Sequence, residues 1–174
     1  MVDYPAKLIL MRDAISLERC QKLHPKVRQE AIEAIEEAEA GFPSNMKVRV
    51  VQGLRTIEEQ NELYAQGRTK PGNIVTKAKG GKSLHNYGLA IDFALMYDKD
   101  YNGSFEELSW NIAKDGDNDG KKDWDEVVAA FEKRGWSWGG KWRTFKDYPH
   151  VQKDFGFTVS QLFAKYKPNE YVDI

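Results

Sequence analysis

The stretch from residue 83 to 95 most restricts the folds that this chain can adopt. In it, polar side chains are interspersed among large apolar ones. In residues 89–95 the large apolar side chains occupy every second position, and Ala90, Asp92 and Ala94 fall between them. This alternation predicts a β-strand, one face of which carries a single carboxylate between two methyl groups. Gly88 precedes the strand and permits a sharp turn after His85. We therefore expect His85 and Asp92 to meet at an uncrowded surface.

A second polar motif, Asp147-Tyr148-Pro149-His150, lies far downstream. The imidazoles of His85 and His150 and the carboxylate of Asp92 together make the ligand set of a catalytic zinc, which keeps a fourth position open for water. Asp147 is outside this set, and the proline of the motif fixes the backbone between it and the histidine. A carboxylate in this position can take a proton from the zinc-activated water.

The two motifs, Ser-x-His-x-x-Gly-x-Ala-x-Asp and Asp-x-x-His, resemble those of the cell-wall zinc peptidases, which include D-Ala-D-Ala carboxypeptidases and L-alanyl-D-glutamate endopeptidases. The similarity covers residues 23–157. It implies the same three zinc ligands, with Asp147 as the catalytic base and Ser83 as a group that supports the ligands from behind. It also implies that Arg55 points at the scissile carbonyl oxygen and stabilises the negative charge that develops there. The alternative for Arg55 is a surface ion pair with Glu58 or Glu59.

Length and resemblance together predict the architecture. At 174 residues the chain is long enough for one domain with a real core, and we expect a single zinc peptidase domain over residues 1–174. The resemblance implies an α+β fold of the Hedgehog/DD-peptidase type, in which a small antiparallel sheet bears the zinc site and helices pack around it.

Capping residues and apolar spacing predict the positions of the helices. Ser16 can cap the first helix, and Thr56 and Glu59 are spaced as a capping box for the third. His24 lies at a break between helices, where a structural role is expected. Helices are expected over residues 16–23, 25–40, 56–66 and 124–134 and in the tail from residue 154, and strands over residues 47–53 and 89–95.

Two further side chains are candidates for substrate contact. Gln60 lies on the helix that follows Arg55, where it contacts either the site or only solvent. Trp138 belongs to an aromatic run, residues 135–142, just ahead of the second motif. Tryptophans more often build a core than a ligand site, but a flat ring in a cleft can pack on a sugar or a peptide. We assign Gln60 and Trp138 to substrate binding.

Residues 115–126 match the side-chain positions of an EF-hand calcium loop. Carboxylates occupy loop positions 1, 3, 5, 9 and 12, and glycine at position 6 permits the sharp turn. The segment before the loop, residues 105–114, is a weaker helix candidate than the segment after it. An acidic surface turn is the alternative to a bound ion. The predicted calcium ligands are Asp115, Asp117, Asp119, Asp123 and Glu126, with Lys121 contributing its backbone carbonyl.

Charge and cysteine content restrict the partners and the compartment. The 26 basic and 27 acidic residues nearly cancel, which argues against nucleic acid as a partner. No apolar run is long enough to span a membrane. The single cysteine, Cys20, suits a reducing compartment. The apolar run at residues 8–11 is too short for a signal sequence. We expect a monomer that acts on bacterial peptidoglycan and stays in the host cytoplasm until its release, as phage endolysins do.

These observations predict zinc-dependent hydrolysis of peptidoglycan stem peptides. Carboxypeptidases of the family commonly carry Glu where this chain has Asp147, so the resemblance favours an L-alanyl-D-glutamate endopeptidase acting as a phage endolysin, with calcium in a regulatory or structural role. One alternative is a D-Ala-D-Ala carboxypeptidase or dipeptidase of cell-wall remodelling. Another, from a different class, is a noncatalytic module that binds zinc and calcium.

Overall fold

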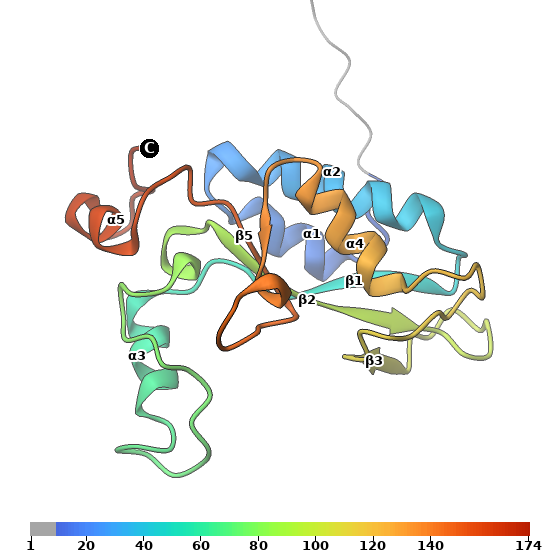
Figure 1. Cartoon of the computed structure of the whole chain (residues 1–174), viewed down its shortest axis with the longest axis horizontal. Helices are drawn as coiled ribbons and strands as arrows, with labels where there is room; N and C mark the ends of the chain where they lie inside the picture. Colours follow the sequence, from blue (N-terminus) through green and yellow to red (C-terminus); the bar gives the residue numbers. More distant parts are fainter. Residues whose placement is uncertain (1–9) are drawn as a thin grey trace, which may run out of the picture.

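The chain forms an antiparallel sheet with helices packed on it (Figure 1). The computed structural model describes residues 10–174, so the expected absence of a signal sequence falls largely outside the described residues. The elements in chain order are α1 (Ala14–Gln21), α2 (Pro25–Gly41), β1 (Met46–Gln52), α3 (Ile57–Ala65), η1 (Leu84–Tyr87), β2 (Ala90–Tyr97), β3 (Glu107–Ser109), α4 (Asp123–Glu132), β4 (Ser137–Trp138), η2 (Gly139–Lys141), β5 (His150–Gln152) and α5 (Val159–Lys165).

Strand β2 is the centre of the sheet. The strand order is β1-β2-β5-β4, β3 pairs with β2 beyond this path, and every pair is antiparallel. The alternation in residues 89–95 therefore does form a strand, which extends to Tyr97. Asp92 lies opposite His150 on β5 and opposite Gln52 on β1. This register brings the two polar motifs side by side.

Helices α1, α2 and α4 cover one face of the sheet, while α3 and α5 lie beyond one end of it (Figure 1). The core between these helices and the sheet includes Ile35, Phe93, Trp124 and Phe131, all fully buried. The ring centroids of Phe93 and Trp124 are 4.6 Å apart. Burial of these large apolar surfaces is the main force that holds the layers together. Within residues 10–174, no helix combines the length and the apolar character that crossing a bilayer requires.

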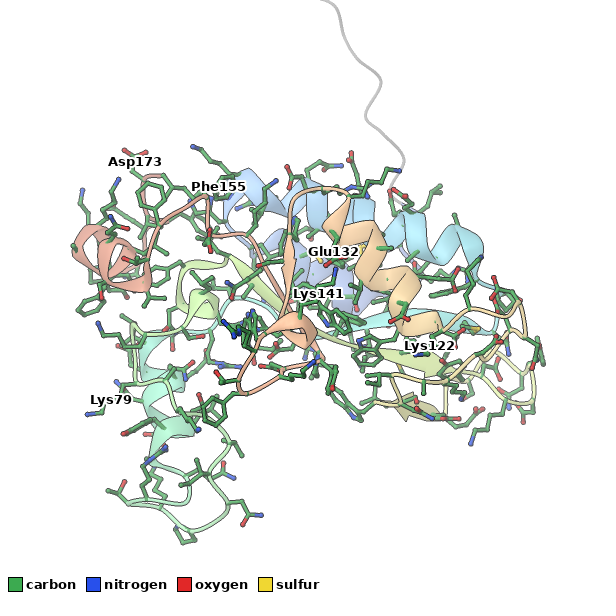
Figure 2. All side chains as sticks on the ribbon, in the orientation of Figure 1. Lys79, Lys122, Glu132, Lys141, Phe155 and Asp173 are labelled. Atoms are coloured by element: carbon green, nitrogen blue, oxygen red, sulfur yellow. The ribbon has the colours of Figure 1, made fainter. Side chains whose placement is uncertain are left out.

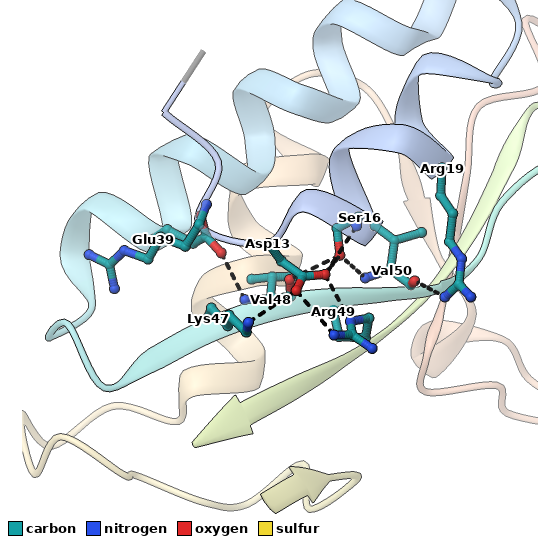
Figure 3. Close-up of polar contacts among 9 residues, drawn as sticks. Asp13, Ser16, Arg19, Glu39, Lys47, Val48, Arg49 and Val50 are labelled. Atoms are coloured by element: carbon teal, nitrogen blue, oxygen red, sulfur yellow. Dashed lines mark hydrogen bonds and ion pairs between the residues drawn. The ribbon is translucent and has the colours of Figure 1, made fainter. Parts of the chain in front are cut away.

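A buried carboxylate, Asp13, joins α1 to β1 (Figure 3). It caps α1 by accepting from the backbone N–H of Ser16, at 3.0 Å, and it pairs with Arg49 at 2.8 Å and Lys47 at 3.1 Å. Burial raises the pKa of Asp13, but these partners outweigh it and bring the pKa down to about 2. The prediction that Ser16 caps α1 is wrong, because its hydroxyl lies inside the first turn and accepts from the N–H of Val50 at 2.8 Å.

Most of the other helix predictions are confirmed. The capping box of α3 is present, with Thr56 Oγ1 accepting from Glu59 N at 3.0 Å and the Glu59 carboxylate accepting from Thr56 N at 2.8 Å. His24 has a structural role, because it caps α2 and its Nε2 bonds the Val172 carbonyl at 2.8 Å. The weak helix prediction for residues 105–114 is wrong, since that segment forms β3 and turns. The acidic loop therefore has an exiting helix, α4, and no entering helix.

Candidate metal centre and active site

The structure brings His85, Asp92 and His150 together at the middle of the sheet. Asp92 Oδ1 lies 3.2 Å from His85 Nε2 and 3.0 Å from His150 Nδ1. The three ligand atoms lie within 4.8 Å of one another, which is close enough to hold one metal ion. Both histidines are buried, and their ring centroids are 5.1 Å apart in an edge-on arrangement. Two imidazole nitrogens and a carboxylate oxygen are a donor set that suits zinc.

Local structure fixes the His85 ring. Ser83 begins the 3₁₀ turn η1, and its Oγ accepts from the backbone N–H of His85 at 3.4 Å. The turn ends at Gly88, whose φ of 67° suits glycine, and a Cβ there would lie 2.7 Å from His24 N. The His85 Nδ1 hydrogen bonds to the Gly53 carbonyl at 2.8 Å. His85 Nε2 therefore keeps its lone pair, directed at the ligand cluster.

The charge of Asp92 dominates the electrostatics of the cluster. Burial alone would raise its pKa, but the imidazoles of His150 and His85 beside the carboxylate hold the pKa well below its ordinary value. Burial would likewise lower the pKa of His150, yet the Asp92 carboxylate raises it above the ordinary value. Asp92 is thus anionic in the fold, which is the protonation state a metal ligand requires.

Asp147 lies on the same cleft as the three ligand residues. Its backbone N–H donates to the Gly139 carbonyl at 3.2 Å, and a Cβ on Gly139 would lie 2.4 Å from the Asp147 carbonyl oxygen, so only glycine permits this approach. The loss of hydration in the cleft, followed by the negative charge of Asp92, raises the pKa of the Asp147 carboxyl. An anionic Asp147 is therefore a better proton acceptor than an ordinary surface aspartate.

Arg55 borders the cleft and is tied to the first ligand. Its backbone N–H donates to the His85 carbonyl at 3.0 Å, and its Nη1 donates to Gln60 Oε1 at 2.9 Å. Its Nε is buried and has no hydrogen-bond partner among residues 10–174. The Asn86 side chain donates to the Arg55 carbonyl at 3.0 Å. Asn86 is not among the residues predicted for the site, although its position directly after His85 is a usable signal.

The structure places the two candidate substrate residues away from the cleft surface. Gln60 is fully buried and lies behind Arg55, where its Nε2 also donates to the Ala78 carbonyl at 2.8 Å. It supports Arg55 and the following loop instead of contacting solvent or substrate. Trp138 donates its indole N–H to the Tyr148 carbonyl at 2.7 Å. The tryptophan that borders the cleft is Trp142, whose ring centroid is 5.3 Å from that of His150.

The cleft above the ligand residues has a volume of about 770 Å³. Its rim includes Lys77 and Lys82 from the loop that leads into the first motif. Lys79 from the same loop points outward, on the α3 side of the molecule (Figure 2). Lys141 of η2 pairs with Glu132 of α4 at 2.5 Å. The rim of the cleft thus carries two lysines on the side of the loop that leads into the first motif.

Comparison with known proteins shows the family to which the chain belongs. A sequence model described as D-alanyl-D-alanine carboxypeptidase matches residues 76–153, which include His85, Asp92 and His150. The peptidoglycan L-alanyl-D-glutamate endopeptidase CwlK of Bacillus subtilis (strain 168) is 52% identical over 130 residues, covering 75% of this chain and 72% of CwlK. The chain belongs to this family of cell-wall peptidases. The crystal structure of the Serratia marcescens L-Ala D-Glu endopeptidase ChiX matches with a TM-score of 0.52 and 24% identity, over 84% of this chain and 92% of ChiX. That match confirms the predicted α+β fold.

The peptidase also carries the acidic loop, residues 115–126, at the start of α4. Gly120 has a φ of 89° and donates its N–H to Asp115 at 3.0 Å. Lys121 pairs with Asp119 at 2.8 Å. Glu126 Oε2 is buried and has no hydrogen-bond partner among the described residues. Two overlapping groups of carboxylates lie close enough to hold a cation, namely Asp115, Asp117 and Asp123, and Asp117, Asp119 and Glu126.

Proposed function

We propose that this peptidase is a zinc-dependent endopeptidase that hydrolyses the bond between L-alanine and D-glutamate in peptidoglycan stem peptides. The observation that carries the proposal is the meeting of His85 Nε2, Asp92 Oδ1 and His150 Nδ1 on one open cleft. Two imidazoles and one carboxylate with an open side are the ligand set of a catalytic zinc. The identity with CwlK supports the choice of bond, since its name states that activity.

The residues around the cleft divide the chemistry among them. When bound, zinc supplies a Lewis acid that polarises the scissile carbonyl and acidifies water. The Asp147 carboxylate takes a proton from the attacking water and passes it to the nitrogen of the departing amine. Arg55 lines the cleft, and its guanidinium donates to the carbonyl oxygen as negative charge grows on it. Lys77 and Lys82 at the rim attract the carboxylates of the stem peptide.

D-Ala-D-Ala carboxypeptidase activity is the second candidate, because the matching family model carries that description. Mass analysis of defined muropeptides digested by the zinc-loaded protein separates the two. We expect fragments with a new carboxyl terminus on L-alanine and a new amino terminus on D-glutamate. Release of terminal D-alanine alone would establish the carboxypeptidase. Failure to cleave either bond would contradict a peptidase function.

We also propose a calcium ion in the acidic loop, with the ligands that the sequence predicts. The unpartnered Glu126 oxygen supports this, as does the raised pKa of Glu126, which results from burial first and then from the charge of Asp119. A bound cation would give this oxygen a partner and would lower the pKa of Glu126. The loop connects to the active site through Trp124, whose indole N–H donates to the Tyr148 carbonyl at 3.1 Å, next to Asp147. Ordering of the loop would therefore steady the catalytic base.

Calcium titration tests this second site. Calcium is expected to raise the melting temperature and the rate of muropeptide cleavage, because an ion that binds only the folded state stabilises it. In Glu126→Gln both effects should require much higher calcium. Glu62→Gln, an exposed glutamate that pairs with Lys70, is the matched control and should respond as the wild type does. A wild-type protein whose stability and rate ignore calcium would rule the site out.

A biological role as a phage endolysin, held in the host cytoplasm until a pore-forming protein releases it, is also our proposal. Its support is the resemblance of the two motifs to those of L-alanyl-D-glutamate endopeptidases, together with the acidic loop at residues 115–126, because some endolysins of this family carry a calcium loop. The relative CwlK is a protein of Bacillus subtilis, so wall remodelling by a bacterium is the alternative. A holin gene next to the coding sequence would favour the endolysin, and a chromosomal setting without phage genes would contradict it.

A further inference from the structure

We infer that Gln152 is a positioning residue that holds His150 in the tautomer required for metal binding. Gln152 is the last residue of β5, two positions after His150, so both side chains lie on the same face of the strand. Gln152 Oε1 lies 2.9 Å from His150 Nε2. This inference rests on the proposed zinc site and adds to it a residue that none of the predicted roles includes.

The position of the His150 ring determines which nitrogen must carry the hydrogen. Its Nδ1 lies 3.0 Å from Asp92 Oδ1 and faces the ligand cluster. To bind a metal there, Nδ1 has to present its lone pair, so the hydrogen of the neutral imidazole has to be on Nε2. His150 is buried, and a buried N–H without an acceptor costs free energy. Gln152 Oε1 is the acceptor that the fold supplies.

The two ligand histidines use opposite nitrogens and different kinds of support. His85 donates from Nδ1 to the backbone carbonyl of Gly53 and presents Nε2. His150 donates from Nε2 to the side chain of Gln152 and presents Nδ1. Only the second support can be removed by a substitution. Without Gln152 as acceptor, the tautomer with its hydrogen on Nδ1 becomes favourable, because that hydrogen can bond Asp92. The Nδ1 hydrogen would then occupy the position of the metal.

The sheet holds Gln152 in place independently of its side chain. Its backbone pairs with Ala90 on β2 and with Ser137 on β4. The Ser137 hydroxyl donates to the Gln152 carbonyl at 3.4 Å and does not reach His150. Ser137→Ala is therefore a control that perturbs the Gln152 backbone contact without changing the acceptor.

Zinc affinity, measured by competition with a chromophoric chelator, tests the inference. Gln152→Leu is expected to bind zinc about 10- to 100-fold more weakly, the range typical for loss of a partner behind a ligand histidine. Gln152→Glu keeps an acceptor and should bind at least as tightly as the wild type. Ser137→Ala should be unchanged. Thermal unfolding of the metal-free proteins should be alike, because the effect lies in metal binding and not in folding.

The outcomes separate this inference from the proposed function. If the wild type binds zinc, His150→Ala loses it and Gln152→Leu binds as the wild type does, the role of Gln152 is overturned and the zinc site stands. If the wild type does not bind zinc, both the role of Gln152 and the proposed zinc site are refuted. Should Gln152→Leu not fold, the ¹⁵N spectrum of the zinc-loaded wild type decides. A hydrogen on His150 Nε2 supports the inference, and zinc bound through that nitrogen refutes it.

Discussion

Replacing Asp147 by asparagine is expected to lower kcat for muropeptide hydrolysis by about 10²–10⁴-fold, the usual contribution of a general base. The amide has the shape of the carboxylate but cannot accept the proton of the attacking water. Zinc affinity should stay close to that of the wild type, because Asp147 is outside the group of ligand atoms. Loss of hydrolysis with zinc retained would also exclude a noncatalytic metal-binding module.

The raised pKa of Asp147 predicts two further measurable effects, one on stability and one on the pH dependence of kcat/KM. Its raised value means that the fold disfavours the charged form, and this cost appears as the pH rises above the carboxyl's ordinary pKa of 3.8. The amide of the Asp147→Asn variant is uncharged, so the metal-free variant should be no less stable than the wild type at neutral pH. In the wild type, kcat/KM should fall at low pH as Asp147 becomes protonated. The plot of kcat/KM against pH for the variant should lack this fall. Asp173→Asn, at an exposed position, is the control, and undiminished wall lysis by Asp147→Asn would refute its role as the base.

The second large effect is expected from His85→Gln, which should abolish both zinc binding and hydrolysis. The variant removes one of two imidazole donors, and the remaining pair cannot hold the ion in an open, three-ligand site. Because zinc binds only the folded site, zinc at a hundred times its Kd should stabilise the wild type by about 2.7 kcal/mol, and the variant should gain nothing. Calorimetric titration and thermal unfolding with and without zinc measure both effects.

His24→Gln is the matched control for this prediction. His24 caps α2 and bonds the Val172 carbonyl, and it has no part in the metal cluster although it is one of only three histidines in the chain. The variant should lose about 1 kcal/mol of stability through the weakened cap. It should still bind zinc and cleave muropeptides. Chelation should inactivate the wild type reversibly, and retention of zinc by His85→Gln would contradict the ligand assignment.

Short-range patterns in the sequence were sufficient for the local features of this protein. The alternation around Asp92 specified a strand, and Thr56 and Glu59 specified the start of α3, because both signals depend on residues only a few positions apart. Residue chemistry alone also selected the histidines of the two motifs over His24. The prediction for Ser16 was wrong for the complementary reason. A hydroxyl can serve a helix or a neighbouring strand, and β1 lies across a long separation in sequence.

The remaining features depend on long-range packing. The pairing of Asp92 with His150 spans 58 residues, and their register depends on how β2 and β5 bury their apolar faces. The same packing buries Gln60 behind Arg55, and neither position can be read from a short pattern. The tautomer support from Gln152 is also a tertiary property, since it exists only once the His150 ring is turned toward Asp92. Local spacing therefore predicted the candidate reactive groups, and the packed fold determined which of their atoms face one another.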